Sequence, residues 1–393
     1  MTALRHNVLQ GKWLRLWLTV SFAVMFTGPF LFHSRVAMLN VVDVLFFVPA
    51  LTLLTRALVS GDKRLLLDPW LIPLYAFLGW ALLSLIWAAD ANSSRTVRAV
   101  VEIVILVGIL RWVHVYYRHT LKQALANGAM TAMVVLAAIM VSYYTIQPLT
   151  SPLFSEPASL IFNLPQPGPL LSTMALVAPS FILLAQALDE GFEPKGARRG
   201  AGALVGFTFL LLVHWQTGVM LLVMALGWIL LRAGQRLLAA LAGAVALYMA
   251  LDFEVLRQAS LYFSHPIFGN GLNQESGDSL MMTLNNGLRV IPHPDNILLA
   301  VVHGTGLIGL VLFVACWAVP AWALPDSNEN HREGAVFLVS VLPGLLAMLS
   351  NGAYLLVPFH ASWMCLWLPL ALMLASLSSR DRLRPRAVVQ PHP

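Results

Sequence analysis

Residues 296–320 read NILLAVVHGTGLIGLVLFVACWAVP and contain no Asp, Glu, Lys or Arg. A helix of this length exceeds the roughly 20 apolar residues that cross a bilayer core about 30 Å thick. Similar stretches recur along the whole chain, where hydrophobic residues make up 59% of 393 positions and charged residues 11%. We therefore expect an all-α, polytopic integral membrane protein that forms a single membrane domain over residues 1–393.

Twelve stretches have the length and composition of membrane-spanning helices. The two around Gly218 are short, as kinked half-length helices lining a cavity would be. The first follows three basic residues without a convincing cleavage site, so we expect a retained helix rather than a removed signal sequence. The twelve spans cover approximately residues 16–32, 36–55, 69–89, 97–113, 128–147, 169–188, 201–216, 218–232, 237–251, 296–320, 335–350 and 361–378.

Basic residues predict the orientation of these spans, because cytoplasmic loops are rich in Lys and Arg. With the N-terminus inside, 19 of the 24 Lys and Arg fall in cytoplasmic segments, including a basic tail at residues 379–393. Both termini are then cytoplasmic, and topology explains the net charge of +6 without a nucleic-acid partner. The five basic residues left on the outer face are Arg35, Arg95, Arg98, Arg257 and Arg289.

The largest soluble piece is the predicted outer loop at residues 252–295. It contains the helix-like stretch DFEVLRQASLYFSHP and ends at RVIPHPDN. Arg257 is a candidate for binding a diphosphate, since guanidinium presents a fork of donors to phosphate oxygens. Its alternative role is that of an interfacial arginine reaching lipid headgroups, and Arg289 and Arg35 are further candidates for substrate binding. The acidic residues of this loop match no metal signature, and we expect no metal and no cofactor.

The segment HPDN, residues 293–296, places an imidazole and a carboxylate two residues apart where the loop enters a span. His293 could accept a proton from a sugar hydroxyl, with Asp295 orienting it or acting as the base. The alternative is a helix N-cap, in which Asp295 or Asn296 binds free amides of the span. His360, His214 and Gln216 are further outer-face candidates for sugar contacts, whereas Trp215 and Trp363 are predicted to lie in the interfacial aromatic belt.

Other polar residues in apolar stretches have structural interpretations. Gly304, Gly306 and Gly309 allow a bend or a close backbone approach, and a neighbouring His303 is expected to bond another segment. Asp43 is expected to pair with a neighbouring helix, and Glu102 with Arg98 at helical spacing, although intramembrane carboxylates also occur in ion pathways. Both cysteines, Cys316 and Cys365, are predicted to be packing residues.

The stretch from Arg257 to Phe313 resembles the signature region of the bacterial O-antigen ligase and polymerase superfamily. Arg257 and the later HPIFGNG, residues 265–271, resemble an arginine, an aromatic and an "hPlfGxG" turn. The later HPDNILLAVVHGTGLIGL resembles "HPHN" followed by glycine and "GxxGL". Two positions depart from the pattern: Asp295 replaces the second histidine, and Gln216, Thr217 and Gly218 replace an outer "SRG".

This resemblance implies a membrane glycosyltransferase of the bacterial inner membrane. Its donor would be an undecaprenyl-diphosphate-linked glycan, joined on the periplasmic face to a lipid A-core sugar by inverting, metal-independent displacement among membrane lipids. Arg257 would stabilise the diphosphate leaving group, and His293 or Asp295 would take the acceptor proton. The alternatives are a Wzy-type polymerase, a protein O-oligosaccharyltransferase, or a lipid or glycan transporter, which the twelve spans and intramembrane carboxylates would also fit.

Overall fold

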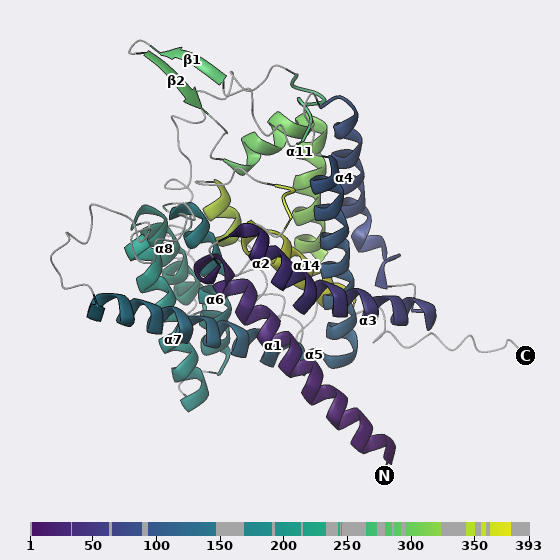
Figure 1. Ribbon diagram of the computed structural model, residues 1–393, viewed down its shortest axis with the longest axis vertical. Helices are drawn as coiled ribbons and strands as arrows, with labels where there is room; N and C mark the ends of the chain where they lie inside the picture. Colours follow the sequence, from purple (N-terminus) through teal and green to yellow (C-terminus); the bar gives the residue numbers. More distant parts are fainter. Residues whose placement is uncertain are drawn as a thin grey trace, which may run out of the picture.

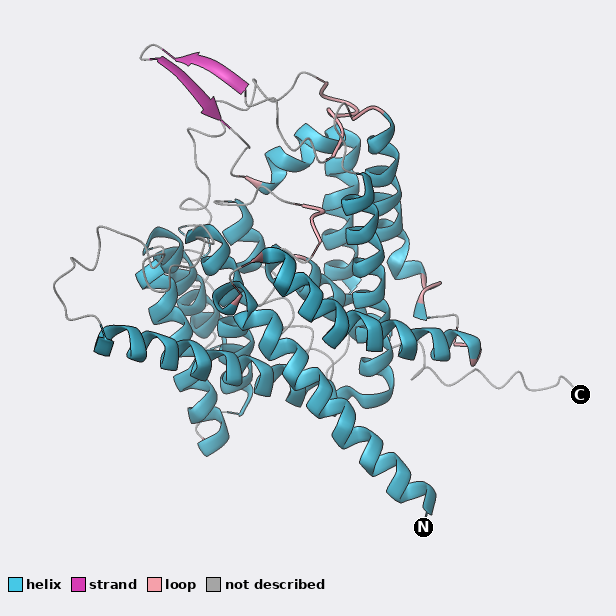
Figure 2. Ribbon diagram, viewed as in Figure 1, coloured by secondary structure: helices cyan, strands magenta, loops and turns pink. Residues whose placement is uncertain are grey.

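The structure is a computed structural model in which the following residues are described: 2–32, 34–62, 65–88, 93–146, 169–190, 193–213, 215–232, 243, 245, 265–272, 280–284, 287–291, 296–323, 343–349, 355–358 and 362–378. These residues are mainly helical, as Figure 2 shows. The protein therefore has the predicted helical membrane architecture, to which the structure adds one small β-hairpin.

Figure 1 shows the arrangement of the helices. Their order along the chain is α1 (Thr2–Leu31), α2 (Arg35–Val42), the π-helix η1 (Asp43–Phe47), α3 (Val48–Val59), η3 (Pro69–Leu71), α4 (Ile72–Leu83), η4 (Ser84–Ile86), α5 (Ser93–Ile146), α6 (Pro169–Glu190), α7 (Pro194–Val213), α8 (Trp215–Arg232), α11 (Ile297–Ala323), α13 (Ser362–Cys365) and α14 (Trp367–Ser378). Residues 343–349 are also helical.

Several of these helices are long and apolar enough to cross a membrane. Within the described residues there are five such stretches, at Gly11–Leu31, Val36–Val59, Pro69–Ile86, Ser93–Ile139 and Ile297–Ala323. Shorter apolar helices occupy Leu176–Leu188, Gly218–Gly227 and Trp363–Leu377. Most of the predicted span at residues 237–251 and most of the one at 335–350 lie outside the described residues.

Helix α5 differs from the prediction of two spans joined by a loop. Residues 114–127, predicted as a loop, are helical, and the backbone leaves the helical region at Tyr117 (φ −140°, ψ 42°). Strong helix formers such as Leu121, Lys122, Gln123 and Ala124 follow this kink, which explains why no loop is needed there. The kink divides α5 between the two predicted spans.

The centre of the molecule is formed by α14, which packs against α5 and α11 (Figure 1). Trp363 and Trp367 are buried, and their indole N–H groups donate to the carbonyl oxygens of Val357 (2.9 Å) and Leu355 (3.1 Å). The prediction that Trp363 lies in the interfacial belt is wrong, because its indole nitrogen finds a backbone acceptor inside the protein. Cys316 and Cys365 are buried free thiols, which agrees with their predicted packing role.

A buried ion pair joins α5 to the segment before α4. Arg111, with 1% of its side chain exposed, donates to Asp68, with 9% exposed. Asp68 also caps η3, since its Oδ1 accepts from the Trp70 amide at 3.2 Å. Removing either charge alone would leave the other buried without its counter-ion, which is costly in a protein interior.

The hairpin is the one departure from an all-α fold among the described residues. Strands β1 (Leu280–Leu284) and β2 (Gly287–Ile291) pair antiparallel, with Leu280 opposite Ile291 and Leu284 opposite Gly287. The sequence places two asparagines and then Gly287 between the apolar runs, a composition typical of hairpin connections. The hairpin lies within the predicted outer loop, at the end of the molecule opposite the N-terminus (Figure 1).

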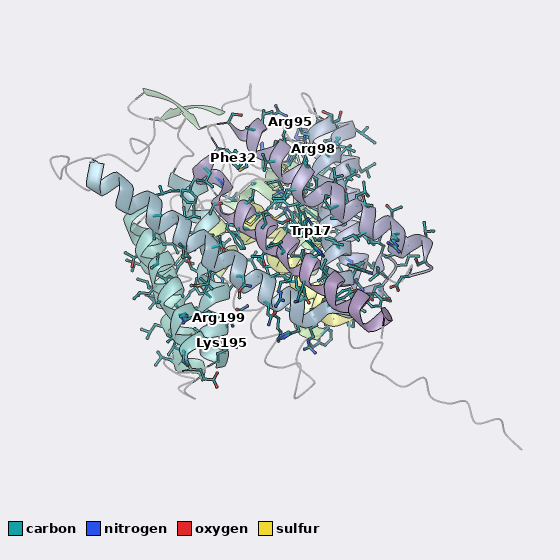
Figure 3. All side chains as sticks on the ribbon, turned by 60° about the horizontal axis from the view of Figure 1, so that its bottom comes forward. Trp17, Phe32, Arg95, Arg98, Lys195 and Arg199 are labelled. Carbon is teal, nitrogen blue, oxygen red and sulfur yellow. The ribbon has the colours of Figure 1, made fainter. Side chains whose placement is uncertain are left out.

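The charged residues that were predicted on opposite faces lie at opposite ends in Figure 3. Arg95 and Arg98, predicted on the outer face, lie toward the end that carries the hairpin. Lys195 and Arg199, predicted in the cytoplasm, lie toward the other end. Arg199 pairs there with Glu190, where α6 is followed by α7. This separation agrees with the two faces inferred from the distribution of basic residues.

Candidate functional site

Helix α11 is broken at Gly306, in the middle of the apolar stretch that decides the fold. Gly306 has φ 69° and ψ −171°, a conformation reserved in practice for glycine. The break interrupts the regular hydrogen bonds of the helix on both sides. Irregular backbone at this depth needs other partners, since lipid supplies none.

Those partners come from a turn at residues 265–272, here called the glycine turn. The amides of Leu307 and Ile308, after the break, donate to the carbonyl oxygens of Pro266 (2.8 Å) and Ile267 (3.5 Å). The carbonyl oxygens before the break also accept from this turn: His303 from the Asn270 amide (2.7 Å) and Gly304 from the Gly271 amide (2.9 Å). The turn thus replaces the hydrogen bonds that α11 loses.

Glycines make this close approach possible. A Cβ at Gly306 would collide with the carbonyl oxygen of Ile267, and one at Gly269 would lie 2.5 Å from the amide nitrogen of Gly306. Gly269 itself has φ 73° and Gly271 φ 91°. The predicted close backbone approach at the glycines of α11 is therefore confirmed. The backbone that approaches α11 is the glycine turn, which contains the HPIFGNG part of the signature described above.

Aromatic side chains surround the same junction. Trp80 of α4 donates its indole N–H to the carbonyl oxygen of Thr305 at 2.8 Å, which satisfies the last acceptor before the break. Phe268 of the glycine turn packs against Trp80 and Trp87, with ring centroids 6.0 and 6.2 Å away, and the two tryptophan rings also contact each other at 5.8 Å. Phe268 remains 54% exposed. Exposed rings at one end of a span are typical of a membrane interface.

His303 contacts the glycine turn through its side chain as well as its carbonyl group. Its Nδ1 lies 3.1 Å from Nδ2 of Asn270, the distance of a hydrogen bond. This contact agrees with the expectation that His303 bonds a neighbouring segment. It also fixes the imidazole on the junction.

Asn296 begins α11 as its N-cap. Its Oδ1 accepts from the amides of Leu298 (2.9 Å) and Leu299 (3.3 Å), and its Nδ2 donates to the carbonyl oxygen of Leu349 (2.8 Å). Asn296 is 2% exposed. The structure therefore assigns to Asn296 the capping role that the sequence left open between two residues. The HPDN segment consequently ends at a residue tied to two parts of the bundle.

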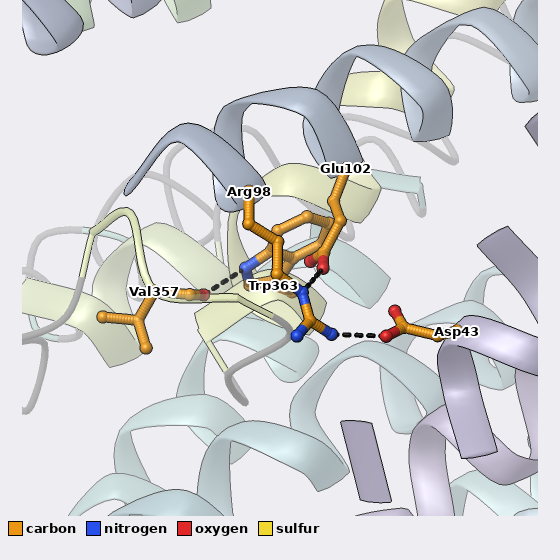
Figure 4. Close-up of polar contacts among 5 residues, drawn as sticks. All are labelled: Asp43, Arg98, Glu102, Val357 and Trp363. Carbon is orange, nitrogen blue, oxygen red and sulfur yellow. Dashed lines mark hydrogen bonds and ion pairs between the residues drawn. The ribbon is translucent and has the colours of Figure 1, made fainter. Parts of the chain in front are cut away.

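A cluster of three charged side chains lies near the same end of the molecule. Arg98 donates from Nε to Oε1 of Glu102 at 2.6 Å and from Nη2 to Asp43 (Figure 4). Glu102 has 6% of its side chain exposed, whereas Arg98 has 41%. The pairing expected for both carboxylates is confirmed, and one guanidinium serves them both.

Residues 355–358 and α13 are anchored next to this cluster. Asp43 begins the π-helix η1, and Phe47 at its end packs edge-on against Trp363 with ring centroids 6.0 Å apart. Trp363 is held to Val357 by the indole hydrogen bond shown in Figure 4. A π-helix at this position is notable, because such irregular turns occur frequently at functional sites.

The residues predicted to carry the chemistry fall largely outside this description. Arg257, His293, Asp295, His360 and His214 lie outside the described residues. The remaining candidates are described only by their backbone: Arg289 lies in β2, Arg35 begins α2 and Gln216 lies in α8. Arg98 was predicted to pair with Glu102, and Asp43 with an unspecified neighbouring helix. That Arg98 is the partner of Asp43 had no signal in sequence, because the two residues are 55 positions apart.

The apolar helices, the broken span and its satisfied backbone define a multi-pass helical membrane protein. No family model matches the chain. The chain is similar to the O-antigen ligase of Pseudomonas aeruginosa, with 29% identity over 326 residues that cover 78% of each protein. This similarity supports the superfamily resemblance found in the sequence and a glycosyltransferase-like enzyme in general terms.

Proposed function

We propose that this protein is an O-antigen ligase-type glycosyltransferase. It transfers a glycan from undecaprenyl diphosphate to a lipid A-core sugar on the periplasmic face of the inner membrane. The observation that carries the proposal is the junction between the glycine turn and α11, because it joins HPIFGNG to HGTGLIGL. The similarity to the Pseudomonas O-antigen ligase supports the same activity.

The junction supports a site at the start of α11. The glycine turn follows Arg257 by eight residues in sequence, and Asn296 follows His293 by three. The glycine turn and the Asn296 cap both form hydrogen bonds to the same helix, α11. A rigid support of this kind is what positioned catalytic groups require, since small displacements lower the rate strongly.

The proposed reaction is a single displacement at the anomeric carbon. The acceptor hydroxyl oxygen attacks that carbon, the bond to the diphosphate oxygen breaks, and the configuration inverts. Arg257 stabilises the charge that develops on the diphosphate leaving group. His293 or Asp295 receives the hydroxyl proton, so no metal is needed to balance charge or protons.

The test is an in vitro reaction with a labelled undecaprenyl-diphosphate glycan and purified full-length protein. Transfer to lipid A-core is expected, whereas product formed only on a second lipid-linked glycan or on a protein hydroxyl would reassign the enzyme to polymerase or protein glycosyltransferase. Release or movement of the donor in proteoliposomes without a new glycosidic bond would indicate a transporter. Activity should persist in excess EDTA.

Single substitutions test the assigned roles. Arg257→Ala is expected to abolish transfer at an unchanged protein level in the membrane, and Arg95→Ala serves as the matched control because Arg95 is an exposed outer-end arginine. Full activity of Arg257→Ala would remove it from the mechanism. His293→Ala and Asp295→Ala identify the base, since only loss of that residue should abolish proton transfer. Full activity in both variants would place the base elsewhere.

A further inference from the structure

An open groove lies at the end of the bundle near the N-terminus, away from the glycine turn. Its volume is about 1010 Å³, and its walls come from the start of α1, from α3 with the residues that follow it, and from the kink in α5. At one end of the α3 lining lie Val48 and Pro49, with Trp17 of α1 also in the wall, and at the other end, called here the mouth, lie Arg56 and Asp62. The lining therefore changes from apolar to charged along α3.

The length of this gradient matches one leaflet of a bilayer. Val48 and Ser60 both line the groove and are twelve residues apart, which corresponds to about 18 Å along a helix. Half of a hydrocarbon core is about 15 Å thick. Val48 and Thr52 are exposed, which leaves this face of α3 open to the bilayer. The lining along α3 is thus about as long as one leaflet is thick.

Aromatic residues place the mouth at the membrane interface. Trp13, Trp112, Tyr116 and Tyr117 line the groove, and Trp13 is 69% exposed. Tryptophan and tyrosine gather where acyl chains meet headgroups, because their rings are apolar and their N–H or O–H groups are polar. The polar end of an occupant would therefore lie beside Arg56 and Asp62.

The two charges at the mouth are of opposite sign. Arg56 is exposed, and none of the ion pairs formed within the described residues involves it. Its guanidinium suits a phosphate, to which it can donate two hydrogen bonds. Asp62 accepts a hydrogen bond from the Tyr116 hydroxyl, and a carboxylate has room for about four. A primary ammonium group is a donor of the kind that a carboxylate can accept alongside its other partners.

We propose that this groove binds one bilayer phospholipid whose headgroup carries a phosphate and a primary amine, as phosphatidylethanolamine does. Arg56 binds the phosphate, Asp62 binds the ammonium group, and the acyl chains lie against Trp17, Val48 and Pro49. The site is independent of the proposed transferase activity, because the groove and the glycine turn share no residue.

The test is native mass spectrometry of the full-length protein in micelles with equal amounts of phosphatidylethanolamine, phosphatidylcholine and phosphatidylglycerol. The wild-type protein is expected to retain the ethanolamine lipid preferentially. Arg56→Gln should weaken binding of all three about fivefold, the equivalent of roughly 1 kcal/mol for one basic residue near a membrane. Asp62→Asn keeps an acceptor for Tyr116 and should abolish the preference for ethanolamine over choline, whose quaternary ammonium has no N–H donor.

Matched controls separate the site from general surface effects. Arg95→Gln and Glu193→Gln change exposed charges outside the groove and should leave lipid retention unchanged. Thr52→Trp should block the apolar part and reduce retention of every lipid, with size-exclusion chromatography confirming that the fold is intact. Equal retention of the three lipids by the wild-type protein would overturn the proposal. So would unchanged binding in Arg56→Gln, or preferential retention of a polyprenyl phosphate.

Discussion

The amide of Leu307 donates a hydrogen bond of 2.8 Å to the carbonyl oxygen of Pro266, which lies 41 positions earlier in the chain. This bond joins the second half of α11 to the glycine turn. It replaces a bond that the break at Gly306 removes from the helix. The turn and the helix consequently form one structural unit. A substitution that displaces either of them should also displace the start of α11.

Gly306→Ala tests this junction. Its Cβ would collide with the Ile267 carbonyl oxygen, and alanine at φ 69°, ψ −171° is strained by roughly 1–3 kcal/mol before that collision is counted. We expect a lower unfolding temperature in detergent and loss of glycan transfer. Gly79→Ala is the matched control, because a Cβ there meets nothing within 4 Å. Wild-type stability of Gly306→Ala would mean that the turn does not hold the helix.

Asp68→Ala should destabilise the protein by about 3–5 kcal/mol, because it leaves Arg111 buried without a counter-ion. The double variant Asp68→Ala with Arg111→Met should recover part of that loss. Chemical unfolding in detergent measures the difference. Glu190→Gln, which removes the more exposed ion pair with Arg199, is expected to cost only about 0–1 kcal/mol.

Arg98→Gln should destabilise the cluster that Arg98 forms with Asp43 and Glu102, because it leaves the two carboxylates without their shared cation. We expect about 2 kcal/mol, less than for a fully buried pair, because the Arg98 side chain is 41% exposed. Adding Glu102→Gln should restore part of the loss. If the double variant is no more stable than Arg98→Gln, the two residues are not coupled.

Asn296→Ala removes both the cap of α11 and the bond to Leu349. Loss of the cap alone should cost about 1 kcal/mol. Under the proposed mechanism, kcat should fall more than KM rises, because His293 and Asp295 directly precede this residue in sequence. Asn296→Ser keeps an acceptor for the helix amides without burying a charge, so it should retain more stability than alanine. Equal kcat in wild type and Asn296→Ala would show that the cap does not position the base.

Local patterns in the sequence predicted the membrane class and most helix positions. Apolar length is a property of each segment, which is why residues 16–32, 169–188 and 296–320 were found close to α1, α6 and α11. The break in α11 was also foreseeable from its glycines. Burial of Trp363 and the contact between Asp43 and Arg98 were not, since each depends on segments far apart in the chain.

The sequence predicted the backbone elements that support the candidate site better than it predicted the residues that carry the chemistry. Two separate motifs, HPIFGNG and HGTGLIGL, were recognised as parts of one signature, and the structure joins them. The capping role of Asn296 was one of two alternatives considered for HPDN. The sequence could not choose between Asp295 and Asn296, because either side chain can accept from free helix amides. The roles of Arg257, His293 and Asp295 stay predictions.

Most of the hydrogen bonds at the break in α11 join peptide groups, and the side chains of Trp80, Asn270 and His303 add two more. Ile267, Phe268 and Leu307 are half or more exposed there, so their identities are free to drift as long as the glycines persist. Under the proposed function, enzymes built on this frame can exchange the residues that meet the sugar while retaining the same attachment of loop to helix. Such a division would let one scaffold acquire new glycan preferences without refolding.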